Sequence, residues 1–157
     1  MKRKIKLSAL LIAVTVAIAP SCKKNNDKND NTTKTKTELL TTGTWKFTAA
    51  AISPAYDYYG DGNSVTDIFS IMKPCEKDDY EIYKTNGIWE YHEGPTTCYP
   101  LNPQEFSDSW HFAANETKLV VGTDDISILE LTATTLKLRY TFEDAGITYT
   151  EEDTYGH

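Results

Sequence analysis

The sequence predicts an all-β domain, an antiparallel up-and-down barrel of about eight strands with one or two short helices. Three observations support this prediction. Apolar and polar residues alternate in several short runs, which is typical of strands with one buried face. Aromatic and β-branched residues, which strands prefer, are frequent in these runs. Turn-forming sequences separate the runs at short intervals, so most neighbouring runs are expected to pair as hairpins.

The expected elements follow one another with short connections. In the first strand, Trp45 and Phe47 alternate with Lys46 and Thr48. The Asn-Gly pair at Asn86 favours a tight hairpin turn. The expected strands span residues 44–52, 79–84, 87–93, 105–113, 117–121, 125–131, 135–142 and 146–153, and the expected helices lie at about 37–41 and 65–72.

Short, evenly spaced strands are compatible with a sandwich or an up-and-down barrel. Consecutive hairpins favour a meander, and closing a meander into a barrel removes its exposed edges. An eight-stranded barrel is either filled by its own side chains or holds one small ligand. The strand pattern is consistent with both.

The N-terminus predicts a lipoprotein-type signal peptide over residues 1–21. A basic start is followed by a 13-residue, mostly apolar run at 7–19. This run is shorter than the ~20 residues that span a bilayer. Ala19 and Ser21 also satisfy the rule for ordinary secretion. Lipidation of Cys22 is favoured because it leaves the other two cysteines to pair.

Composition changes sharply after the signal. Residues 23–38 contain no apolar side chain, so 22–38 are expected to form a disordered tether and 39–157 the folded domain. The domain carries 7 basic and 20 acidic residues, a net charge of −13. Such a domain repels phosphate backbones, so nucleic-acid binding is not expected.

The two remaining cysteines predict a disulfide. Cys75 and Cys98 enclose 22 residues, including the Asn-Gly hairpin. An exported protein tends to oxidise such a pair. A pair of metal-binding thiolates is the alternative, but CxxC spacing and a neighbouring histidine are both missing.

One acidic loop partly matches a calcium-binding loop. Asp57, Asp61 and Asp67 are the candidate ligands of a weak site. Positions 3 and 12 of the motif lack side-chain ligands, however, and Asp67 comes one residue early. A turn followed by a helix that Ser64 caps is favoured over calcium binding.

Catalytic motifs are missing from the sequence, so an enzyme is not expected. The paired acids at Asp78-Asp79 and Glu151-Glu152 are read as solvated residues at turns or strand ends. His92 and His111 fall on polar strand faces and are read as solvated, and the last residue, His157, is expected to fray.

The Gly43-Thr44-Trp45 segment resembles the lipocalin G-x-W signature, in which a short helical turn precedes the first strand. Further matching segments are PCEKDDYEIYKTNG, SWHF and ILELTATTLKLRYTF. Over residues 39–150 the chain is similar to the lipocalin-like domains of small bacterial cell-envelope lipoproteins.

This resemblance implies a barrel anchored in the cell envelope, with the outer membrane as the expected location, that binds a small apolar molecule without a cofactor. The alternative is a non-enzymatic structural or interaction module with a filled barrel. In lipocalins the signature tryptophan closes one end of the barrel under a basic residue, for which Arg139 is a candidate on the polar face of its strand. The barrel-signature and candidate ligand-lining residues are Gly43, Trp45, Trp89, Trp110 and Tyr140. For the three tryptophans, filling the barrel is favoured over direct contact with a ligand.

Overall fold

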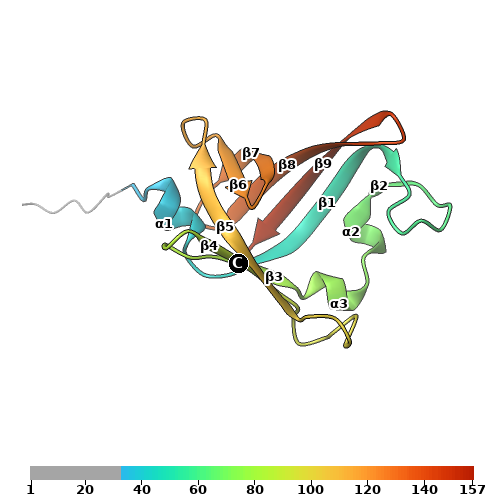
Figure 1. Cartoon of the computed structure of the whole chain (residues 1–157), viewed down its shortest axis with the longest axis horizontal. Coiled ribbons are helices and arrows are strands. Elements are labelled where there is room, and N and C mark those ends of the chain that lie inside the picture. Colours follow the sequence, from blue (N-terminus) through green and yellow to red (C-terminus); the bar gives the residue numbers. More distant parts are fainter. Residues whose placement is uncertain (1–32) are drawn as a thin grey trace, which may run out of the picture. The chain divides into compact units, whose positions relative to one another are not determined.

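Eight antiparallel strands close into a barrel in the computed structural model, which describes residues 33–157 (Figure 1). The predicted signal peptide, Cys22 and the first part of the predicted tether lie outside the described residues. The elements are α1 (Lys36–Leu40), β1 (Trp45–Tyr56), β2 (Val65–Asp67), α2 (Ile68–Ile71), α3 (Pro74–Lys77), β3 (Tyr80–Tyr83), β4 (Ile88–His92), β5 (Glu105–Ala113), β6 (Lys118–Val121), β7 (Asp124–Leu131), β8 (Thr135–Asp144) and β9 (Ile147–Gly156).

The barrel is a meander in which neighbours in sequence pair. From β3 to β9 each strand pairs with the next, and β1 pairs with both β3 and β9, which closes the ring. The prediction of an all-β up-and-down barrel with short helices is therefore confirmed. A ninth strand, β2, pairs only with the far half of β1 and lies outside the ring.

The segment between β1 and β3 differs from the prediction. Residues 65–67 form β2 rather than the start of a helix: Val65 and Asp67 pair with β1, and the β-branched Val65 and Thr66 favour a strand. The helix α2 begins only at Ile68. Its N-cap is Asp67, whose carboxylate accepts a 3.0 Å hydrogen bond from the amide of Ser70, so Ser64 is not the cap. A second short helix, α3, was not predicted.

The first helix begins inside the range expected to be tether. Thr35 and Glu38 form a capping box: the Thr35 hydroxyl accepts from the Glu38 amide, and the Glu38 carboxylate accepts from the Thr35 amide. Among residues 33–157, no helix is long and apolar enough to cross a membrane.

Two hydrophobic clusters lie inside the barrel, and Phe47 packs against both. The larger cluster lies near α1 and is called the filled end; its buried members are Leu40, Trp45, Tyr83, Trp110, Leu119, Ile126, Leu136, Leu138 and Tyr155. The smaller cluster lies beside α2 and consists of Ala50, Ile52, Ile68 and Tyr149. In Figure 1, α1 and α2 lie at opposite ends of the barrel. The α2 end is called the open end.

Candidate functional site

Trp45 closes the filled end. Its side chain is fully buried, and its indole N–H donates a 2.8 Å hydrogen bond to the carbonyl of Leu40 at the end of α1. The ring of His157 packs on it with 4.0 Å between ring centroids. Gly43 adopts φ +79°, and a Cβ there would lie 3.2 Å from His157. The glycine of the G-x-W segment thus leaves room for the last residue of the chain.

The basic residue over Trp45 is therefore His157, and Arg139 does not cover it. Arg139 is exposed and donates to Glu152 on the outer face of the barrel. His157 is not frayed, because its imidazole Nδ1 lies 2.8 Å from the carbonyl oxygen of Thr44 while its ring packs, tilted by 34°, against Trp45.

The other sequence-predicted residues separate into two groups. Trp110 belongs to the filled end, where its indole N–H donates to the carbonyl of Lys84 at 2.9 Å. Trp89 and Tyr140 are half-buried and border a cavity of about 300 Å³. We call this the side cavity; it is lined by Glu81, Tyr83, Trp89, Asp108, Val121, Thr123, Asp124, Ile126 and Tyr140. Gly43, Trp45 and Trp110 line neither this cavity nor the one at the open end.

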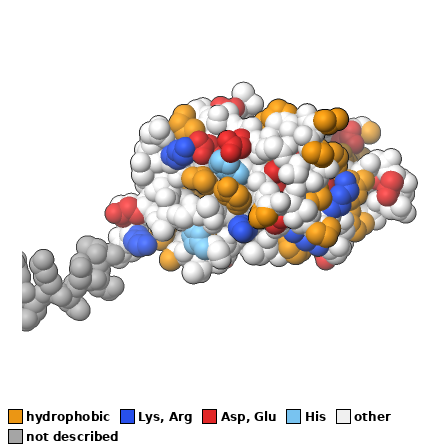
Figure 2. Space-filling model, turned by 90° about the horizontal axis from the view of Figure 1, so that it is seen from below, with side chains coloured by type: hydrophobic (Ala, Val, Ile, Leu, Met, Phe, Trp, Pro, Cys, Tyr) orange, Lys and Arg blue, Asp and Glu red, His pale blue; other side chains and the backbone are white. Residues whose placement is uncertain are grey.

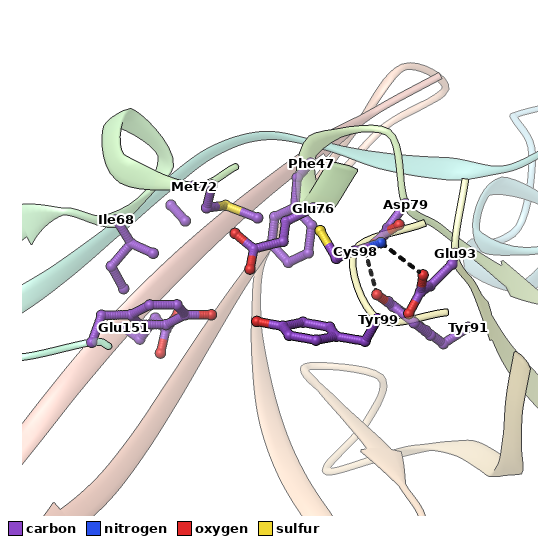
Figure 3. Close-up of a pocket in the computed structure, with 12 residues that line it drawn as sticks. Phe47, Ile68, Met72, Glu76, Asp79, Tyr91, Glu93, Cys98, Tyr99 and Glu151 are labelled. Atoms are coloured by element: carbon purple, nitrogen blue, oxygen red, sulfur yellow. Dashed lines mark hydrogen bonds between the residues drawn. The ribbon is translucent and has the colours of Figure 1, made fainter. Parts of the chain in front are cut away.

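The open end contains a second cavity of about 280 Å³ (Figure 3). We call it the end cavity; it is lined by Phe47, Ala50, Tyr58, Ile68, Met72, Glu76, Asp79, Tyr91, Glu93, Cys98, Tyr99 and Glu151. Its wall comes from β1, α2, α3, β4, β9 and the loop between β4 and β5. Aromatic and aliphatic side chains alternate around it with carboxylates, and the ring of Tyr99 and the carboxylate of Glu76 project into the space (Figure 3).

The disulfide partners hold one wall of the end cavity together. The sulfur atoms of Cys75 and Cys98 lie at disulfide distance, as predicted, with 5.3 Å between their Cα atoms. Cys75 lies on α3 and Cys98 on the β4–β5 loop. The amide of Cys98 also donates to Glu93 at 3.2 Å. This link fixes the loop that carries Tyr99 against the helix that carries Glu76.

Asp79 is buried, which corrects its reading as a solvated turn residue. One of its carboxylate oxygens accepts from the hydroxyl of Tyr91 and the other from the amide of Gly94 at 3.0 Å. Burial raises its pKa, although the two hydrogen bonds oppose this effect. The loop after β4 folds back over Asp79, and this contact is not encoded in the local pattern of the sequence.

Two further carboxylates lie on the inner face of β9. Tyr149, Glu151, Asp153 and Tyr155 alternate with outward-facing residues, so Glu151 faces the interior and not solvent. Asp153 is only 5% exposed, and its Oδ1 has no hydrogen-bond partner. Burial, followed by the negative charges of Glu151 and Glu81, raises its pKa to about 8. Burial also raises the pKa of Glu151.

Glu81 is the fourth carboxylate inside the barrel. It accepts from the indole N–H of Trp89 at 2.9 Å and from the hydroxyl of Tyr83 at 2.7 Å. Burial raises its pKa, and these hydrogen bonds lower it. Glu81 borders the side cavity beside Trp89. We call Asp79, Glu81, Glu151 and Asp153 the interior carboxylates.

Sequence reasoning missed Glu81 and Asp153 as site residues. In the segment 80–83, the apolar residues Tyr80 and Ile82 suggest the inner face, but Glu81 and Tyr83 point inward. For Asp153 a signal was present, because it alternates with Tyr149 and Tyr155, and extending the last strand past residue 153 would have shown it.

The calcium candidates are engaged within the chain. Asp57 accepts from the amides of Asp61 and Gly62 at 2.9 and 2.8 Å, and Asp61 accepts from the amide of Asn63 at 2.9 Å. Asp67 caps α2. Within residues 33–157, no group of three or more His, Cys, Asp or Glu side chains is placed to hold a metal ion. Calcium binding stays a prediction.

The two strand histidines lie apart from the interior carboxylates. His92 is half-buried rather than solvated: it stacks on Tyr80 with 4.9 Å between ring centroids and lies 3.2 Å from Glu90 and 3.3 Å from Glu105. His111 is exposed. Figure 2 shows that, on the face it draws, basic side chains are interspersed with hydrophobic and acidic ones.

Neither a protein-family model nor a curated protein matches this chain.

Proposed function

We propose that this protein is a lipid-anchored, lipocalin-like protein of the bacterial cell envelope that binds a small, largely apolar molecule in the end cavity. The observation that carries the proposal is the end cavity, a space of about 280 Å³ beside α2 that is accessible from outside, in a barrel closed at its other end around Trp45. The side cavity has a similar volume but lies against Tyr83 and Ile126 of the larger cluster. A concave site with apolar walls and a few polar groups is the usual form of a small-molecule site.

The walls of the end cavity suit an apolar body. Ile68 is buried, and Phe47 and Met72 are half-buried at its edge. Tyr58 and Tyr99 are exposed aromatic rings at its mouth. A ligand that covers these rings removes apolar surface from water, at roughly 25 cal/mol per Å². No enzymatic step is part of this proposal.

Native mass spectrometry of the protein purified from its own host tests ligand binding. We expect a bound small molecule on the parent chain. Met72→Trp, which places a large ring at the cavity edge, should lose the ligand. Leu101→Trp is the matched control, because Leu101 is 98% exposed and does not line the cavity. A ligand-free parent, or a ligand that Met72→Trp retains, would contradict binding in the end cavity.

Anchoring is tested at Cys22, which lies outside the described residues. Two acyl chains on one cysteine are sufficient for stable membrane attachment. Cys22→Ser should abolish incorporation of labelled palmitate and move the protein from the membrane fraction to the soluble one. Cys98→Ser should keep the label. Label retained by Cys22→Ser would exclude Cys22 as the lipidated residue.

A filled-barrel structural or interaction module is the second candidate. The tight packing of the filled end favours it, since Leu40, Leu119 and Leu138 are fully buried there. A ligand-free protein from its host, combined with normal folding, would favour this candidate over small-molecule binding.

A further inference from the structure

The interior carboxylates have no cationic partner. Among residues 33–157, no lysine, arginine or histidine nitrogen lies within 4 Å of any of their oxygens. Most of the domain's cations are engaged on the surface. Lys84 pairs with Glu90, Lys118 with Asp125, and both Lys137 and Arg139 with Glu152. When the interior carboxylates ionise, no cationic side chain of the described residues therefore compensates their charge.

Asp153 is the clearest case. Burying a carboxylate without a partner is costly, because the charge loses its hydration and gains no hydrogen bond. Asp153 is 95% buried, and its Oδ1 has no partner. It pairs through its backbone with Ala50, and it shares the inner face of β9 with Glu151. Both Ala50 and Glu151 line the end cavity, so Asp153 lies beside that cavity.

The end cavity is also lined by aromatic rings, which lie near these carboxylates. Tyr58, Tyr91 and Tyr99 line it together with Phe47. Burial raises the pKa of the Tyr58 hydroxyl, and the negative charges of Glu151, Glu76 and Asp153 add to this effect. Carboxylates combined with aromatic rings are the groups that bind ammonium ions, through charge attraction and cation–π contact.

At the rim of the end cavity, a lysine of the chain already makes both kinds of contact, one with an aromatic ring and one with a carboxylate. The ammonium group of Lys73 lies 4.9 Å from the ring centroid of Tyr99 and 3.7 Å from Glu76. Lys73 thus neutralises Glu76 at the mouth, but it does not reach the interior carboxylates.

From these contacts we infer that the end cavity selects a ligand with a positively charged ammonium group. Glu151 and the surrounding tyrosine rings receive this group, and Asp153, beside the cavity, adds negative charge behind them. This inference rests on the proposed function and names the class of its ligand. An organic cation fits better than a metal ion. The lining is about half aromatic or aliphatic, and the carboxylates do not converge as metal ligands do.

Three probes that differ only in their head group test the inference: 4-phenylbutylammonium, 4-phenylbutan-1-ol and 4-phenylbutanoate. Each is titrated by calorimetry at pH 8 into the full chain in phospholipid nanodiscs, with empty nanodiscs as the blank. We expect the cation to bind about tenfold or more tightly than the alcohol, and the anion to bind more weakly than both.

The double variant Asp153→Asn/Glu151→Gln should reduce the affinity for the cation about tenfold and change that for the alcohol less than twofold. Glu152→Gln is the matched control. Glu152 lies between them on β9 but faces outward and pairs with Lys137 and Arg139. It should leave both affinities unchanged. Melting curves of each variant verify that it is folded.

The outcomes separate the inference from the proposed function. If the alcohol binds as tightly as the cation, or if the double variant binds the cation like the parent, the inference is overturned while small-molecule binding stands. If none of the probes binds, the inference is also overturned, and the ligand measurement on host-purified protein decides the proposed function by itself.

Discussion

The two ends of this barrel belong to one meander, but the side chains inside them differ in chemical character: those at one end are mostly apolar, and those at the other include several carboxylates. At the filled end, aliphatic and aromatic side chains pack closely, and the buried indole N–H groups of Trp45 and Trp110 both reach backbone carbonyls. At the open end, carboxylates lie beside a cavity and Asp153 has an unpartnered oxygen. The first arrangement stabilises the fold. The second costs stability, and such costs concentrate at functional sites.

The largest expected effect lies at the filled end. Trp45→Ala removes a fully buried ring and its hydrogen bond to Leu40, so we expect it to lower the free energy of unfolding by about 3–5 kcal/mol. Met72→Ala, at a half-buried position beside an existing cavity, should lower it by about 1 kcal/mol. Urea denaturation followed by tryptophan fluorescence measures both. Similar losses for the two variants would remove the contrast in packing between the ends.

The second effect concerns the disulfide. Cys75→Ser/Cys98→Ser opens a loop of 22 intervening residues, and we expect a loss of roughly 3 kcal/mol. Because the link joins α3 to the β4–β5 loop, amide hydrogen exchange should accelerate first in residues 93–104. The amides of β6 and β8 near the filled end should stay protected from exchange in the double variant. They should also stay protected in the parent protein after its disulfide has been reduced. Uniform acceleration across the barrel would show that the two ends are not independent.

The third effect is a gain in stability. Asp153 has a pKa of about 8 in the folded chain against an ordinary value of 3.8. An acid whose pKa is raised by folding binds its proton more tightly in the folded state. It favours the folded state most at low pH, and this contribution is lost as pH rises from about 4 through 8. Asp153→Asn removes the penalty, so at pH 8 we expect it to be more stable than the parent by a few kcal/mol, on the order of the shift.

The measurement is urea denaturation of parent and variant at pH 5, 6.5 and 8. The two curves should approach each other at low pH and diverge as pH rises. Glu152→Gln is the control on the same strand, and it should not show this divergence. Parallel pH profiles for Asp153→Asn and the parent would mean that Asp153 does not carry a costly charge at the open end.

The smallest expected effect is that of calcium. The carboxylates of Asp57, Asp61 and Asp67 already accept amide hydrogen bonds within the loop and at the start of α2. We expect millimolar calcium to change the Tm by less than about 1 °C. A calcium-dependent rise in Tm that Asp61→Ala abolishes would instead support the calcium hypothesis. The molecule would then have a metal-binding loop in addition to the two barrel ends.

The barrel could be predicted from the sequence because the patterns that indicate its strands and turns each lie within a few consecutive residues. Alternation such as Leu136-Lys137-Leu138 identifies the inner face of a strand, and Asn86-Gly87 identifies a hairpin turn. The open end could not be predicted in this way. Asp79 looks like a surface acid, and only the return of the β4–β5 loop buries it. The same limit applies to Glu81 at the side cavity, which the closing of the sheet buries. Similarly, nothing near Trp45 in the sequence points to His157, which meets it only when the ring is complete.

The pairing of β1 with β9 also sets the order of events during folding. Each hairpin from β3 to β9 joins neighbours in sequence and can form early, but Lys46 pairs with Gly156 and Ser53 with Thr150, residues from opposite ends of the domain. Contacts this distant in sequence slow folding, because the chain must be brought together before they form. Until β9 has been synthesised, β1 has an unpaired edge, so the ring can close only once residues 147–156 are available.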